Sequence, residues 1–239
     1  MKKIILIYSF FILVSATSCS LLFNYDPIDF EDTENRKDII SLYNEDNFIY
    51  KTNRSFVYEI IKDSISKTKI SNYIELKIIP GSLFKQTKIK YKFFNSLSNL
   101  TKDSSFFWEL TGLIENNKNI WIHPPRSQYY ELEFTAFPEI IIKKDNNKIK
   151  TKWKSTTYTG SEWGLHKNIS ITSKYNFDTD TILNFENINY VCQKIIAIST
   201  SKFGNTKSEF YFSNLIGFVQ LNYFFKDETI KIRLIKITK

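Results

Sequence analysis

The sequence has few cysteines, few histidines and few glycines, and each scarcity excludes a class of protein. Its 239 residues include only two cysteines, Cys19 and Cys192, so a small fold held together by several disulfides is excluded. The two histidines, His123 and His166, form neither an H-x-H nor an H-E-x-x-H pattern, which argues against a histidine-based zinc site. The nearest approach to the G-x-S-x-G pattern of serine hydrolases, over residues 160–164, has its serine in the wrong place.

Long apolar runs are also scarce, and the longest of them stands at the start of the chain. Residues 4–14 are a run of eleven that is apolar except for Ser9, and it is shorter than the roughly twenty residues that a transmembrane helix needs. Lys2 and Lys3 precede this run, and the small residues Ser15 to Ser18 follow it. This order of charge, apolar run and small residues is typical of a secretory signal peptide, so we expect residues 1–18 to be removed after export.

The end of the signal resembles the lipobox of bacterial lipoproteins, because Thr17 and Ser18 stand directly before Cys19. Ala16 departs from the usual leucine of that motif. The resemblance implies cleavage by signal peptidase II, acylation of the Cys19 sulfur with fatty acids such as palmitate, and a lipid anchor to the membrane. The alternative is an ordinary signal cut near Ala16 or Ser18, which leaves Cys19 as a thiol.

The mature chain is basic, but its charge does not indicate a nucleic-acid partner. The formal charge of +8 falls to +6 when Lys2 and Lys3 are removed with the leader. Part of the lysine excess matches a general bias of the sequence towards residues with A/T-rich codons, so it is weak evidence for an acidic partner. An exported protein also does not meet nucleic acid, which lies in the cytoplasm. Surface-exported lipoproteins of some bacteria resemble one another in an acidic cluster after the cysteine. Residues 20–25 carry no acidic residue, so we expect the periplasmic face of the outer membrane.

The composition changes near residue 48, which divides the mature chain in two. Residues 19–47 are rich in Asp, Glu and Asn and are expected to be a tether. Residues 48–239 are expected to form a single all-β domain, large enough to bury a core without disulfides. No apolar helix pattern of twelve residues occurs after the signal.

Alternation of apolar and polar residues predicts most of the strands. Residues 88–93 alternate lysine with apolar residues, as in a half-buried antiparallel strand. Residues 108–114 and 120–123 have the spacing of a hairpin, and Pro80-Gly81 predicts a turn. The pattern also predicts a strand over 129–136, and a tight turn at 145–148 with a return strand over 148–154.

The last fifty residues give the clearest pattern, a four-strand meander. The expected strands are 191–200, 208–212, 218–225 and 230–234, with short polar connections. With Cys192 in its first strand, Tyr-Phe-Ser-Asn at 211–214 and Gly217 to Tyr223 after it, this ending resembles that of uncharacterised envelope lipoproteins of Bacteroidetes-type bacteria. The arrangement is also similar to periplasmic half-barrel carriers of lipoproteins, in which a curved sheet wraps an apolar groove. We therefore expect an all-β fold: a strongly curved antiparallel sheet, as a half-barrel, an open barrel or a sandwich.

The sequence offers no convincing catalytic or metal site, so we expect a protein that is not an enzyme and has no cofactor. His166 lies in a loop that could border a cavity, but no nucleophile or carboxylate stands at a telling spacing from it. Glu131 and Glu133 would share the solvent face of their expected strand. Asp178 and Asp180 lack the glycine and glutamate of a calcium loop. His123, before two prolines, is interpreted as structural, and Cys192 as a small buried apolar residue.

Aromatic residues make up 16 per cent of the chain and are the one feature that supports binding. If one sheet curves without a cover, its concave face would be a groove for a hydrophobic ligand. The candidate ligand-binding residues are Trp108, Trp121, Trp153, Phe134 and Phe218. If the sheet closes on itself, the same residues are core. The alternative function is a structural or protein-interaction lipoprotein without a ligand cavity, whose lysine-rich outer face meets another envelope protein.

Overall fold

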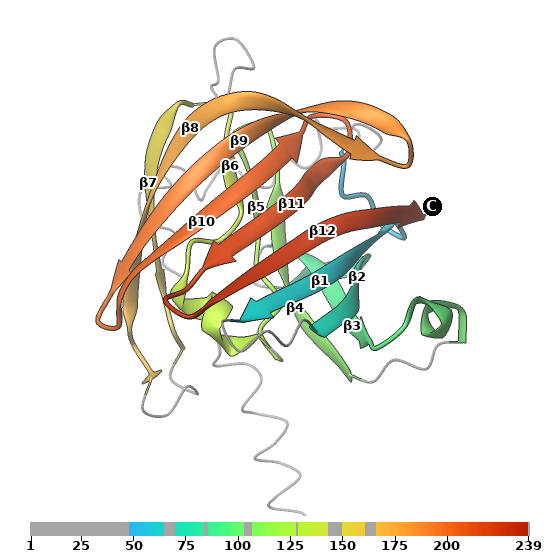
Figure 1. The fold of residues 1–239 in the computed structure, drawn as a ribbon, viewed down its shortest axis with the longest axis horizontal. Helices are drawn as coiled ribbons and strands as arrows, with labels where there is room; N and C mark the ends of the chain where they lie inside the picture. The colour runs from blue at the N-terminus through green and yellow to red at the C-terminus, as the bar shows by residue number, and fades with distance from the viewer. Residues whose placement is uncertain are drawn as a thin grey trace, which may run out of the picture.

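The computed structural model describes residues 48–64, 70–83, 86–102, 107–127, 129–142, 150–160 and 166–238. Within them, twelve antiparallel strands form one sheet that curls into a nearly closed barrel (Figure 1). This confirms the predicted all-β fold, whereas the leader and the tether lie outside the described residues. The strands are β1 (Ser55–Ser64), β2 (Ile70–Leu83), β3 (Gln86–Phe94), β4 (Phe107–Glu115), β5 (Asn119–Ile122), β6 (Glu139–Ile141), β7 (Lys152–Tyr158), β8 (Ser170–Phe185), β9 (Ile188–Ser201), β10 (Gly204–Ser213), β11 (Gly217–Phe224) and β12 (Glu228–Thr238).

Two short 3-10 helices complete the elements, η2 (Leu97–Lys102) and η3 (Tyr130–Phe134). In the part of the chain that the structure describes, no helix has the length and apolar character to cross a bilayer.

The strand order places the opening of the barrel in the middle of the chain. The order is β6-β5-β4-β3-β2-β1-β12-β11-β10-β9-β8-β7, so every neighbour is antiparallel and the first strand pairs with the last. Strands β6 and β7 are consecutive along the chain, yet they are the two edges of the sheet. A seam between them therefore separates the two halves of the barrel.

Between the described residues on either side of this seam, two hydrogen bonds to backbone carbonyls cross it. The Lys150 backbone N–H donates to the Ile141 carbonyl at 2.8 Å, and the Tyr175 hydroxyl donates to the Phe137 carbonyl at 2.9 Å. The predicted return strand over 148–154 does not form a ladder with the strand before it, because its described part, β7, pairs along its length with β8 instead. The ladder with β8 joins seven residue pairs, whereas β6 has only three residues. The predicted turn at 145–148 lies outside the described residues.

The predicted strand over 129–136 is also wrong, because η3 occupies its centre. The Leu132 N–H bonds to the Tyr129 carbonyl at 2.9 Å, and the Thr135 hydroxyl donates to the Leu132 carbonyl at 2.7 Å. These local bonds satisfy the backbone away from any sheet ladder, and they place Leu132 in the core. The alternation in this segment thus comes from a short helix with one face packed against the interior of the barrel.

The predicted turn at Pro80-Gly81 is an irregularity within β2 rather than its end. The pairing of β2 with β3 shifts between Ile78 and Ser82, and Gly81 has φ +99°. Proline has no N–H to donate, so it is tolerated where the ladder is interrupted.

Other sequence predictions are confirmed. Strands β4 and β5 pair as the expected hairpin, and β9 to β12 form the expected meander. Strands β8 and β9 are joined by Glu186 and Asn187, which both have positive φ, as two-residue hairpin turns require.

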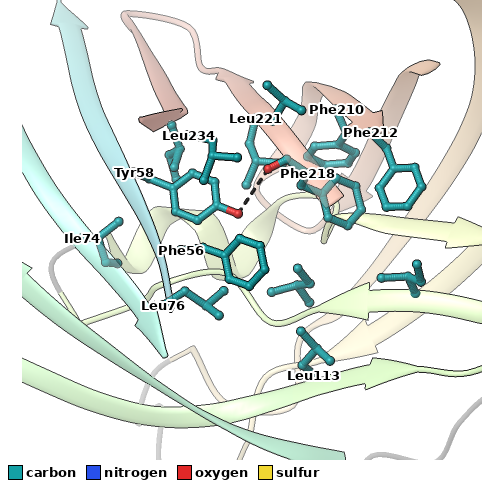
Figure 2. Close-up of a cluster of buried hydrophobic side chains, with 14 of the residues drawn as sticks. Phe56, Tyr58, Ile74, Leu76, Leu113, Phe210, Phe212, Phe218, Leu221 and Leu234 are labelled. Atoms are coloured by element: carbon teal, nitrogen blue, oxygen red, sulfur yellow. Dashed lines mark hydrogen bonds between the residues drawn. The ribbon is translucent and has the colours of Figure 1, made fainter. Parts of the chain in front are cut away.

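The inner faces of the strands meet in one apolar core. Figure 2 shows this core, with Phe56 and Tyr58 of β1 facing Phe210 and Phe218 of the C-terminal meander. The Tyr58 hydroxyl donates to the Phe218 carbonyl at 3.1 Å across the interior (Figure 2). We call the end of the barrel at the β10–β11 turn the Tyr50 end, and the opposite end the η3 end.

Candidate ligand-binding face of the barrel wall

The structure does not gather the five predicted aromatic residues into one groove. Trp153 and Phe218 lie in the core, with 6% and 0% of their surfaces exposed. Trp121 lies on the other face of β5, in a separate small cluster with Ile114 and Phe137.

Trp108 is 52% exposed, and the Lys90 ammonium lies 4.7 Å from its ring centre. Phe134 is partly buried in η3. The contact of these five side chains with a ligand stays a prediction, and only Trp153 borders the set of residues described next.

A row of small hydroxyl side chains faces the interior from β7 to β11. In-register pairing sets Ser155 beside Ser173, Ser173 beside Ser199, and Ser199 beside Thr206. The neighbouring row continues from the Trp153–Tyr175 pair through Ala197 to Ser208 and then to Tyr223. We call this set the hydroxyl wall: Ser155, Thr157, Ser173, Ser199, Thr206, Ser208 and Tyr223.

Apart from Ser155, which bonds the Glu139 carboxyl group, burial and hydrogen bonding divide the hydroxyl wall into two groups. Ser173 and Ser199 are buried and bond each other at 2.8 Å. Four other hydroxyls of the wall are buried atoms that have no hydrogen-bond partner: those of Thr157, Thr206, Ser208 and Tyr223. A buried hydroxyl without a partner costs about 1–3 kcal/mol, so four of them in one region are unexpected unless something else bonds them.

Tyr223 differs from the other tyrosines of the interior in this respect. The Tyr58, Tyr91 and Tyr175 hydroxyls each donate to a backbone carbonyl, at 3.1, 2.8 and 2.9 Å. Burial raises the pKa of Tyr223 well above its ordinary value, so its hydroxyl remains a neutral donor and acceptor.

The hydroxyl wall is uncharged, and its one neighbouring carboxyl group sits at the seam. No Lys, Arg, Asp or Glu occupies an inward position among the described residues of β7 to β11. Glu139 of β6 lies near Trp153 and Ser155, and burial raises its pKa to about 7 although its polar neighbours act in the opposite direction. Its atom Oε2 has no hydrogen-bond partner. Glu139 thus lies at the seam between the two edge strands, and its carboxyl group takes up a proton at a higher pH than an exposed glutamate does.

An aromatic cluster stands at the η3 end, beside the hydroxyl wall. The Phe134 ring lies 5.0 Å from Phe203 in the β9–β10 turn and 5.8 Å from His166, in each case edge to face. His166 and Phe203 are exposed, and the Lys202 ammonium lies 5.2 Å from the Phe203 ring centre. His166 therefore belongs to the rim of the barrel, where it contacts rings rather than a nucleophile.

The other polar residues singled out from the sequence have structural partners. His123 is buried, its Nδ1 lies 2.8 Å from the Pro124 carbonyl, and its Nε2 lies 3.2 Å from Glu133. Burial, with a smaller effect of Arg126, lowers the pKa of His123 to about 3. Glu131 and Glu133 do not share a solvent face as expected, because in η3 Glu133 is buried whereas Glu131 bonds Lys62 at 3.1 Å.

Cys192 lies on β9 with 0% of its surface exposed, which confirms the interpretation as a buried apolar residue. Burial raises the pKa of its thiol to about 11, so the reactive thiolate is scarce at neutral pH. Among the residues that the structure describes, no group of three or more His, Cys, Asp or Glu side chains could hold a metal ion.

Sequence reasoning missed the hydroxyl wall, since serine and threonine at inward positions of a strand look like interruptions of an apolar face.

No protein-family model matches the chain, and no curated protein matches it. Three solved structures resemble it in fold. A candidate exported protein with a YmcC-like fold from Bacteroides fragilis has a TM-score of 0.48 and 9% identity, over 79% of this chain and 97% of that one. A candidate lipoprotein from Parabacteroides distasonis has a TM-score of 0.47 and 9% identity, over 80% and 98%.

The hypothetical lipoprotein YmcC from Escherichia coli has a TM-score of 0.37 and 15% identity, over 86% of this chain and 98% of that one. The expected resemblance to uncharacterised Bacteroidetes lipoproteins is confirmed as a likeness. At these scores and identities, the likeness assigns no function to this chain.

Proposed function

We propose that this protein is a lipid-anchored, non-catalytic component of the bacterial envelope that binds a hydrophobic or lipid-like molecule inside its barrel. The leader and Cys19 support the anchor, since a cysteine directly after small residues is where lipoproteins are acylated. In this proposal the anchor holds the barrel at the periplasmic face of the outer membrane. The barrel then meets lipid-like molecules at the surface where they are most abundant.

The observation that carries the binding proposal is the group of buried hydroxyls without partners on the hydroxyl wall. Thr157, Ser208 and Tyr223 are at most 8% exposed, and each leaves a hydrogen-bonding atom unsatisfied. A barrel that served only as a rigid body would gain stability from apolar residues at these positions. Apolar side chains surround the hydroxyls, so a bound molecule would combine an apolar part with a hydrogen-bonding group.

A second candidate function, a protein-interaction lipoprotein without a ligand, is supported by the outer face of the β8–β9 hairpin. Ile182 and Val191 are directly paired there, and they are 65% and 63% exposed. An exposed apolar pair at the end of a long hairpin offers a contact surface to another envelope protein. It is smaller than the patches that commonly mark such contacts, so we rank this function second.

Labelling and native mass spectrometry test both candidates. Cells that express the full chain are given radioactive palmitate, and we expect label on the wild-type protein but not on the Cys19→Ala variant. The lipid-anchored protein is then purified from its own envelope and examined by native mass spectrometry. A co-purified small molecule supports the first function, whereas a stable protein partner without a small molecule supports the second and contradicts the first.

A further inference from the structure

Exposed aliphatic side chains gather at the Tyr50 end of the barrel. Among the described residues, four aliphatic side chains are more than half exposed: Ile182, Ile188, Val191 and Leu215, at 65%, 56%, 63% and 73%. The first three belong to the β8–β9 hairpin, and Leu215 belongs to the turn between β10 and β11. The most exposed aliphatic surface of the described chain therefore lies at one end of the barrel.

Strand register brings three of these side chains together on the outer surface. Ile182 and Val191 are directly paired, so they lie on one face of their hairpin. The ladder of β9 with β10 ends at the pair of Gln193 and Phe212. Val191 lies two residues past Gln193 towards the Tyr50 end, and Leu215 lies three residues past Phe212 in the same direction. We call Ile182, Val191 and Leu215 the apolar tip. Figure 1 shows the end of the β8–β9 hairpin on the same side of the barrel as the end of β12.

The apolar tip differs from the exposed rings elsewhere on the barrel. The Lys202 ammonium lies 5.2 Å from the Phe203 ring centre, and the Lys90 ammonium lies 4.7 Å from that of Trp108. Residues 181–193 and 213–217 carry the apolar tip and contain no Lys or Arg. A contact at the apolar tip therefore depends on the burial of apolar surface, and attraction to anionic groups does not contribute to it.

The chain enters the barrel at the same end. Phe48 is the first described residue, and the N–H groups of Ile49 and Tyr50 both bond the Glu115 carboxylate. The Tyr50 hydroxyl accepts a hydrogen bond from the Phe218 N–H, directly after the β10–β11 turn. The entry point is thus fixed beside the apolar tip, and whatever holds the preceding residues holds this end of the barrel.

The proposed anchor keeps the Tyr50 end close to the bilayer. Only the 28 residues 20–47 separate Cys19 from Phe48, and 28 residues span at most about 90–100 Å. Because the protein is already attached to the bilayer, a contact too weak to hold a free protein can still form. Exposed Ile, Val and Leu side chains that enter the interfacial region of a bilayer leave water, which is favourable.

We propose that the apolar tip is a membrane-contact surface, where Ile182, Val191 and Leu215 insert into the interfacial region of the bilayer that carries the Cys19 anchor. This inference rests on the lipid anchor of the proposed function and adds the orientation of the barrel to it. The Tyr50 end faces the bilayer, and the η3 end with its aromatic cluster faces away. A protein partner would also cover apolar residues, but the entry of the chain at this end favours the bilayer.

A fluorescent label at position 214 tests whether this end touches lipid. Asn214 is exposed beside Leu215, and Cys192 is buried, so Asn214→Cys supplies the reactive thiol of the acylated protein. The labelled, lipid-anchored full-length protein is reconstituted into phosphatidylcholine vesicles that contain a nitroxide-labelled lipid, and the vesicles are floated on a density gradient. We expect the nitroxide to lower the emission about threefold or more, at low and at high salt alike, since inserted side chains reach about 5–10 Å into the interface.

The matched label position is Lys226→Cys, in the exposed turn between β11 and β12 at the η3 end. The eight residues of β11 place this label roughly 25 Å further from the bilayer, so its emission should not change. The triple variant Ile182→Asn/Val191→Asn/Leu215→Asn should reduce the quenching at position 214 to the level at position 226. Ile198→Asn replaces an exposed residue of β9 outside the apolar tip and should leave the quenching at position 214 unchanged.

The outcomes separate this inference from the proposed function. Protein that floats with the vesicles but is quenched no more at position 214 than at position 226 would overturn the inference and leave the anchor in place. Persistent quenching in the triple variant would overturn the assignment to these three side chains. Crosslinking of a label at position 214 to an envelope protein, without quenching in vesicles, would assign the apolar tip to a protein partner and overturn the membrane contact. Protein that does not float with the vesicles would contradict the anchor itself, and the inference with it.

Discussion

The Tyr50 hydroxyl accepts a hydrogen bond of 2.9 Å from the backbone N–H of Phe218, a residue 168 positions further along the chain. The Tyr50 N–H and the Ile49 N–H both bond the Glu115 carboxylate, at 2.9 and 2.8 Å. The segment that enters the barrel is therefore fixed to the β4–β5 hairpin and to the C-terminal meander at once. This contact joins the start of the domain to its last strands at the Tyr50 end.

Gly217 makes this contact possible, and its replacement is the first prediction. A Cβ atom at Gly217 would lie 2.4 Å from the Tyr50 oxygen, and the residue has φ +83°. We expect Gly217→Ala to lower the free energy of unfolding by about 2–4 kcal/mol, through both overpacking and backbone strain. Urea unfolding followed by tryptophan fluorescence measures the change.

Gly204→Ala is the matched control for this prediction. Gly204 also has a positive φ, +110°, but nothing lies within 4 Å of the position of its Cβ. This variant should therefore lose only about 1–2 kcal/mol, from backbone strain alone. Equal losses in the two variants would show that the Tyr50 contact contributes nothing.

The carboxyl group of Glu139 gives the second prediction, a dependence of stability on pH. Burial raises its pKa to about 7 in the folded protein, above the ordinary value of 4.5. Between pH 4.5 and 7 the folded state holds a proton that the unfolded state has released, so this group lowers stability as pH rises through that range and adds no further change above it. Glu139→Gln should remove this loss and make the protein roughly 1–3 kcal/mol more stable than wild type at pH 8.

The comparison of the two proteins is made by urea unfolding at pH 5, 6, 7 and 8. His123, with a pKa lowered to about 3, acts in the opposite direction below pH 6.5 in both proteins, so the difference between them isolates Glu139. Parallel curves for the two proteins would rule out a raised pKa at the seam.

The interior tyrosines give the third prediction. Tyr58→Phe removes a donor whose partner, the Phe218 carbonyl, stays buried, so we expect a loss of about 1–2 kcal/mol in the free energy of unfolding. Tyr223→Phe removes a hydroxyl that has no partner, and protein free of ligand should lose less than about 0.5 kcal/mol or gain stability. A loss of equal size in the two variants would indicate that the Tyr223 hydroxyl is already bonded within the chain.

The two cysteines give the fourth prediction, a count of thiols. Cys192 is buried and the pKa of its thiol is raised to about 11, so Ellman's reagent should find no reactive thiol in the folded, lipid-anchored protein. In concentrated guanidinium chloride it should find one per chain, because acylated Cys19 has no free thiol. Two thiols per unfolded chain would contradict the lipid anchor.

Much of the sheet could be predicted from the sequence because period-two alternation directly reports the half-buried strands. The lysines of β3 and the meander from β9 to β12 have this pattern, and the structure forms both as expected. The segment around Leu132 alternates in the same way, yet its backbone closes local 3-10 bonds and pairs with no strand. Alternation of apolar and polar residues predicts which side chains are buried. It does not predict whether their backbone pairs with a neighbouring strand.

The candidate site was less accessible to sequence reasoning, because it depends on pairing between distant strands. Ser199 and Ser208 become neighbours of Ser173 and Tyr223 only through the registers of β8 to β11. The predicted aromatic ligand residues are divided between the core, a separate cluster and the outer surface, as Trp153, Trp121 and Trp108 illustrate. The signal in the sequence that could have indicated the site is the occurrence of small hydroxyl residues at inward positions of predicted strands.

A high-resolution crystal structure of the protein purified from its own envelope, without added lipid, tests the central claim most directly. We predict continuous density from a hydrophobic or lipid-like molecule inside the barrel, within hydrogen-bonding distance of Ser208 Oγ or the Tyr223 hydroxyl. Isolated water molecules at these two oxygens, with no other density along the wall, would contradict the account.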